Sequence, residues 1–115
     1  MINKTDLRIG NSVMYKGIAW EVEELKESAI SLRNNGIGWI RRIYDDINPI
    51  PITEEALVKM GAIVTKKNNY NLNGMAITNF NGKFIEYVHQ IELKGIHHLQ
   101  NVYYFTRQTE LTYEP

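Results

Sequence analysis

The sequence predicts an α+β fold whose parts follow one another along the chain: an SH3-like small β-barrel unit, a short linking helix, and an antiparallel β-meander with a terminal helix. Short alternating strands separated by turn residues occupy about residues 7–47 and 62–93. A capped segment at about 53–60 and helical apolar spacing over about 96–107 predict the two helices. The length suits a single compact domain, residues 1–115.

The first strand-rich segment carries the signals of small antiparallel sheets. Apolar and polar residues alternate in Ile18–Leu25, which is the period of a half-buried strand. Shorter strands are expected at about 13–15, 29–32 and 39–44, and Asn34–Gly36 is a turn signal. Because short strands at close spacing are typical of small barrels, we expect an SH3-like unit here.

The linking helix has a start signal and a stop signal. Pro49 and Pro51 keep the preceding chain extended. Thr53 is a suitable N-cap, and the two glutamates after it complement the positive end of the helix dipole. Gly61 is a natural stop. These residues are therefore explained by helix formation, without any chemistry.

Two Asn-Gly turns predict the meander in the second half. Asn73-Gly74 and Asn81-Gly82 each lie between alternating segments, which is the strongest short-range hairpin signal. They connect strands expected at Tyr70–Leu72, Met75–Phe80 and Lys83–Val88. A β-branched segment directly after the linking helix predicts one more strand before them.

Composition excludes several classes of protein. The chain has no cysteine, which excludes disulfides, thiolate metal sites and cysteine nucleophiles. Lys plus Arg and Asp plus Glu number 13 each, and this balance argues against a dedicated binder of duplex nucleic acid. No apolar run is long enough for a signal peptide or a membrane span. We therefore expect a cytoplasmic protein without membrane contact.

No catalytic signature is present. The chain lacks glycine-rich phosphate loops and nucleophile elbows. His97 and His98 would point about 100° apart on a helix, so they cannot easily chelate one metal, and His89 has no placed partner. The paired acids Asp45 and Asp46 are interpreted as solvated residues before a helix. We predict no enzyme, no metal and no cofactor, and an acid–base role for the histidines ranks last.

Aromatic and basic residues suggest a ligand site around the fourth strand. Trp39 with Arg41 or Arg42 could form a platform for a base or a phosphate, and Lys66 adds local positive charge. Alternation along a strand places one of the two arginines on each face. The alternative is a solvent-facing strand whose aromatic residue packs inside.

The terminal helix offers a candidate interface. Ile96, Leu99 and Tyr103 recur at helical spacing, which predicts the buried face. Tyr103, Tyr104 and Phe105 cannot all share that face, so part of this cluster is expected at a surface for a homo-oligomer or a partner protein. The alternative places two of these aromatic residues in the core and one at its rim.

Several stretches in a specific order resemble small uncharacterised proteins of Bacteroidota phages and prophages. The matching stretches are Leu7–Asn11, Trp39-Ile40, Pro49–Leu57, Tyr70–Gly74 and His98–Phe105, while residues 106–111 depart from the pattern. The resemblance implies a phage or mobile-element setting and no established activity.

In that setting the leading hypothesis is a non-catalytic binding protein that sequesters a nucleotide or another phosphate-bearing small molecule as counter-defence. One alternative is an inhibitor that binds a host or phage protein. Another is a small protein with nucleic-acid contact.

Overall fold

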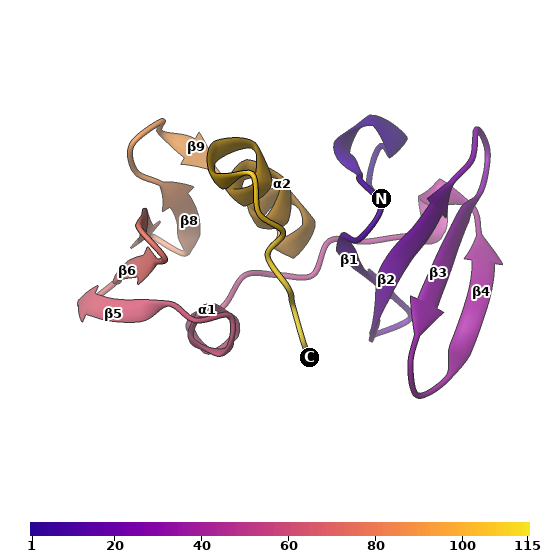
Figure 1. Ribbon diagram of the computed structural model, residues 1–115, viewed down its shortest axis with the longest axis horizontal. Coiled ribbons are helices and arrows are strands. Elements are labelled where there is room, and N and C mark those ends of the chain that lie inside the picture. Colours follow the sequence, from indigo (N-terminus) through magenta and orange to yellow (C-terminus); the bar gives the residue numbers. More distant parts are fainter.

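The computed structural model describes all of residues 1–115 and contains two antiparallel sheets and two α-helices (Figure 1). The strands of the N-terminal sheet are β1 (Ser12–Tyr15), β2 (Ile18–Leu25), β3 (Ile30–Asn34) and β4 (Gly38–Arg42). The strands of the C-terminal sheet are β5 (Ile63–Lys66), β6 (Asn69–Leu72), β7 (Met75–Phe80), β8 (Lys83–Glu86) and β9 (Ile91–Glu92). The helices are α1 (Glu54–Lys59) and α2 (Ile96–Arg107), with short 3-10 turns at Lys4–Asp6 and Tyr44–Asp46.

The α+β class is confirmed, but the N-terminal sheet is not a closed barrel. Its strand order is β1-β2-β3-β4, so β1 and β4 are its two edges. Beyond β2, the only partner of β1 is an isolated bridge between Met14 and Asn48. The sheet stays open because other parts of the chain cover its inner face. Ile2, Leu7 and Ile47, which lie outside the strands, complete its hydrophobic core.

The C-terminal sheet is the predicted meander, with strands paired in chain order from β5 to β9. Both Asn-Gly turns adopt positive φ at both central residues, 50° and 95° at Asn73 and Gly74, 54° and 84° at Asn81 and Gly82. This is the conformation that matches the twist of a tight hairpin. The strand β9, which lies next to β8, was not among the expected elements.

Both helices begin and end close to the predicted positions. Thr53 accepts a hydrogen bond from the backbone N–H of Ala56 at 3.0 Å, the expected N-cap contact of α1. The helix α2 spans the predicted residues, Ile96–Arg107, and its C-cap residue Gln108 has a φ of 59°, in the left-handed region. The longer α2 is therefore the element that can contact both sheets.

Each sheet has its own hydrophobic core, and α2 lies between them (Figure 1). Leu99, Val102 and Tyr103 of α2 pack into the core of the C-terminal sheet. A small third cluster at the junction contains Ile50, Ala56 and Ile96. The molecule measures 41 × 27 × 27 Å, and the two sheets occupy the two ends of its long axis (Figure 1).

Polar contacts complete the joint between the two halves. The Arg8 guanidinium donates to the side-chain oxygens of Asn101 at 3.1 Å and Glu110 at 2.5 Å, and it lies 4.1 Å from the ring centroid of Tyr104. Asn11 also donates to Asn101, at 2.8 Å. One face of α2 therefore packs into the core of the C-terminal sheet. Polar residues of α2 accept hydrogen bonds from the N-terminal half. Neither helix has the length and apolar character needed to cross a bilayer.

Candidate functional site

The outer face of β4 presents Trp39 and Arg41 to solvent. The register of β4 on β3 pairs Leu32 with Ile40 and Ile30 with Arg42, so these residues share the inner face. Trp39 and Arg41 therefore project from the other face, as alternation predicts. The Trp39 side chain is 63% exposed, and Arg41 is also exposed. The Trp39 indole is therefore not part of the hydrophobic core on the inner face of this sheet.

Arg33 lies directly opposite Trp39 in the β3–β4 pair, so it belongs to the same outer face. Its guanidinium lies 3.4 Å from the Glu21 carboxylate, and both side chains are about half exposed, 50% and 52%. An exposed ion pair of this kind contributes at most about 1 kcal/mol, so Arg33 can exchange Glu21 for another anion. Sequence reasoning missed Arg33. The turn at Asn34–Gly36 could have located it, because a hairpin turn fixes which residues face each other.

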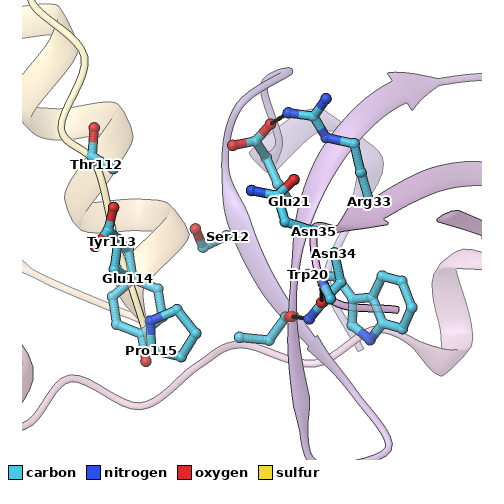
Figure 2. Close-up of a pocket in the computed structure, with 12 residues that line it drawn as sticks. Ser12, Trp20, Glu21, Arg33, Asn34, Asn35, Thr112, Tyr113, Glu114 and Pro115 are labelled. Atoms are coloured by element: carbon cyan, nitrogen blue, oxygen red, sulfur yellow. Dashed lines mark hydrogen bonds and ion pairs between the residues drawn. The ribbon is translucent and has the colours of Figure 1, made fainter. Parts of the chain in front are cut away.

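A cavity of about 480 Å³ opens beside Arg33, between the N-terminal sheet and the last residues of the chain. Figure 2 shows Glu21 and Arg33 on the sheet side and Thr112 and Tyr113 on the opposite side. The side chain of Asn34 donates to the carbonyl oxygen of Ala19 at 3.0 Å, which holds the β3–β4 turn against β2. This hydrogen bond fixes the side of the cavity that the N-terminal sheet forms. Arg33 lines the cavity and also lies next to Trp39 on the outer face of the sheet.

Two of the predicted site residues lie elsewhere. Arg42 faces inward, and its guanidinium lies 4.8 Å from the ring centroid of Tyr15, where it lowers the pKa of the Tyr15 phenol. Lys66 lies on β5, and Figure 1 shows β5 and β4 at opposite ends of the molecule. The fold thus brings Trp39 and Arg41 together, adds Arg33, and leaves Arg42 and Lys66 out.

The histidines of α2 lie at the junction of the two halves. His97 is 4% exposed, its Nδ1 has no hydrogen-bond partner, and burial, followed by the neighbouring His98, lowers its pKa to about 4. The Nδ1 of His98 accepts a hydrogen bond from the backbone N–H of Lys94 at 3.0 Å, and burial lowers the pKa of His98 as well. Both imidazoles are therefore neutral near pH 7. They line a second cavity, of about 350 Å³, together with Asp6.

The aromatic cluster at the end of α2 is mostly covered. Tyr103 is 6% exposed, and its hydroxyl accepts a hydrogen bond from the side chain of Asn73 at 3.1 Å. Tyr104 is half buried under Arg8, as described above. Only Phe105 is largely exposed, at 69%. Tyr103 is therefore a core residue and does not lie at a surface for a partner, because it belongs to the face of α2 that packs on the C-terminal sheet.

Searches against protein-family models, curated proteins and solved structures found no match.

The surface formed by Trp39, Arg33 and Arg41, here called the tryptophan–arginine surface, has the chemistry of a binding site for flat anions. An exposed indole stacks on a nucleobase, a contact that is worth about 1–3 kcal/mol. Guanidinium groups pair with phosphate oxygens through charge-assisted hydrogen bonds.

Proposed function

We propose that the protein is a non-catalytic binding protein that holds a nucleotide or another phosphate-bearing small molecule on the tryptophan–arginine surface. The observation that supports this is the 63% exposure of Trp39 with Arg33 directly across from it. Arg41, two residues further along the same strand, lies on the same face. A flat ligand with negative charge complements this combination better than an uncharged ligand does.

In this proposal the base stacks on the Trp39 indole and the phosphates pair with the guanidinium groups of Arg41 and Arg33. Arg33 exchanges its exposed contact with Glu21 for the phosphate, at a cost of at most about 1 kcal/mol. The cavity beside Arg33 offers room for a second nucleotide unit. Local positive charge on a chain of zero net charge favours a small anion over a long nucleic acid.

The resemblance to phage proteins supports a biological reading of this binding. A phage protein that holds a nucleotide signal of host immunity lowers the free concentration of that signal. Such sequestration requires tight binding and no turnover. We therefore propose counter-defence in the host cytoplasm as the role of the protein.

Thermal unfolding in the presence of a panel of mononucleotides and cyclic oligonucleotides tests the proposal. A ligand that binds only the folded protein raises the unfolding temperature as its concentration rises above the Kd. The effect should be lost in Trp39→Ala and Arg41→Ala and retained in Lys66→Ala, a matched loss of one surface cation at the other end of the molecule. Absence of stabilisation by every member of the panel rejects the proposal.

A second candidate function is inhibition of a host or phage protein. Phe105 favours it, because this side chain is 69% exposed at the rim of the cavity next to His97 and His98. Recovery of a stoichiometric partner by the wild-type protein, but not by Phe105→Asp, would support this function. Equal recovery by both proteins, or by neither, would reject it.

A further inference from the structure

The strand β4 leaves one side of its backbone without a partner. It pairs only with β3, and in Figure 1 it lies at the outer edge of the N-terminal sheet. Trp39 on this strand is 63% exposed, and two isoleucines next to it in the chain, Ile37 in the turn before the strand and Ile43 directly after it, are 59% and 55% exposed. Natural edge strands are commonly protected by charged side chains, proline or a covering segment, because an open edge pairs with other strands. The strand β4 has no proline and no strand on its outer side, and its charged residues are Arg41 and Arg42.

The sequence of this edge is complementary to itself. When two copies of residues 37–43 run antiparallel with Ile40 opposite Ile40, Trp39 of each copy faces the partner's Arg41. Gly38 then faces the partner's Arg42, which leaves space for the long side chain. Just beyond both ends of the paired strands, Ile37 in the turn lies next to the partner's Ile43. We propose that two copies of the chain associate through β4 in this register, as a two-fold symmetric dimer.

Other registers do not give this match. Directly opposed residues of antiparallel strands share a face of the sheet, so a shift by one residue would mix the inner and outer faces. A shift by two residues in one direction places Arg41 opposite the partner's Arg41, where like charges repel. A shift by two in the other direction places Arg41 opposite the partner's Ile37. Only the register centred on Ile40 pairs each indole with a guanidinium and each exposed isoleucine with another.

The dimer joins the two N-terminal sheets into one continuous sheet and removes an open edge from each copy. It also brings Arg41 of the partner subunit next to the Trp39 indole. This pairing does not depend on the proposed ligand, because it requires only the open backbone edge of β4 and the complementary side chains along it.

Disulfide trapping tests the register, since the natural chain has no cysteine. The double variant Ile37→Cys/Ile43→Cys should form a covalent dimer under mild oxidation. Within one chain the whole of β4 (Gly38–Arg42) separates the two positions, which leaves them too far apart for an internal disulfide. Each single variant is a matched control, because in this register its cysteine has no cysteine opposite. Absence of the covalent dimer, or equal trapping of the single and double variants, overturns the proposal.

Sedimentation without any nucleotide tests the association itself. The wild-type protein should be a dimer, and Arg41→Glu should raise the dimer dissociation constant on the order of tenfold, because it removes two cation–π pairs. Lys66→Glu makes the same charge change on β5 and should leave the constant unchanged. A wild-type monomer throughout the micromolar range overturns the pairing. A dimer that binds no member of the nucleotide panel upholds the pairing and rejects only the proposed function.

Discussion

The side-chain oxygen of Gln100 accepts a hydrogen bond from the backbone N–H of Ser12 at 2.8 Å, although 88 positions separate the two residues. The amide nitrogen of the same side chain donates to the carbonyl oxygen of Leu111 at 3.0 Å. Gln100 is 2% exposed, so water does not compete for these groups. One amide therefore connects the edge of the N-terminal sheet, α2 and the segment after α2.

Gln100→Leu should destabilise the protein by about 1–3 kcal/mol, because it leaves the N–H of Ser12 and the carbonyl of Leu111 buried without partners. Chemical denaturation followed by tryptophan fluorescence measures the free energy of unfolding. Arg33→Leu, a polar-to-apolar change on the outer face of β3, should cost much less. Equal losses in the two variants would show that the contacts of Gln100 contribute nothing specific.

Gly95→Ala should destabilise the junction between α2 and the segment before α1. A methyl group at this position would lie 2.8 Å from the Cβ of Pro49 and 3.1 Å from the carbonyl oxygen of Ile50. Overpacking of this kind costs about 1–3 kcal/mol. Gly36→Ala is the matched control, because its added methyl would meet only Asn34 Oδ1, at 3.5 Å. The prediction is wrong if thermal unfolding cannot distinguish the two variants.

Stability should fall as the pH is lowered from about 6.5 toward 4. The pKa of His97 is about 4 in the folded protein, against its ordinary value of 6.5, so the unfolded chain binds more protons within this window. Protonation therefore favours unfolding. The stability that comes from neutral His97 is fully present above its pKa in the unfolded chain. This stability is lost as the pH falls through its pKa in the folded protein. The full loss is about 3 kcal/mol, and burial of His98 acts in the same direction.

The free energy of unfolding measured from neutral pH down to about pH 5 checks this dependence. His97→Gln removes the titrating group, so its stability should change less with pH than that of the wild-type protein. Identical pH profiles for the two proteins would contradict the assignment.

Trp39→Phe should retain part of the affinity for a nucleotide ligand, and Trp39→Ala should lose about 1–3 kcal/mol of binding free energy, because the stacking surface shrinks and then disappears. Titration calorimetry measures both variants with the best ligand of the panel. Arg42→Ala is the control on the inner face of β4 and should bind like the wild-type protein. If Trp39→Ala binds as tightly as Trp39→Phe, the indole is not the platform.

The helices and hairpins could be predicted because their signals are local. The cap at Thr53 and the turns at Asn73-Gly74 and Asn81-Gly82 involve residues within a few positions of one another, and each is found as expected. The spacing of apolar residues gave the bounds of α2 for the same reason.

Pairings between distant segments could not be predicted in this way. Whether the N-terminal sheet closes depends on Ile2, Leu7 and Ile47, which cover its inner face from outside the strands. Lys66 could lie near Trp39 only if their strands belonged to one sheet. The two strands belong to different sheets. Arg33 is a different case, because the hairpin turn at Asn34–Gly36 already implies that it lies opposite Trp39.

The joint between the halves also has a consequence for the order of synthesis. Arg8, Asn11 and Ser12 leave the ribosome first, yet their partners Asn101 and Gln100 follow 88 to 93 positions later. At a synthesis rate of about 5–20 residues per second, several seconds pass between synthesis of the N-terminal sheet and synthesis of the helix α2 that binds it. During that interval the outer edge of the N-terminal sheet is open. This is the period of synthesis in which a chaperone or a second nascent chain has the best opportunity to bind the sheet.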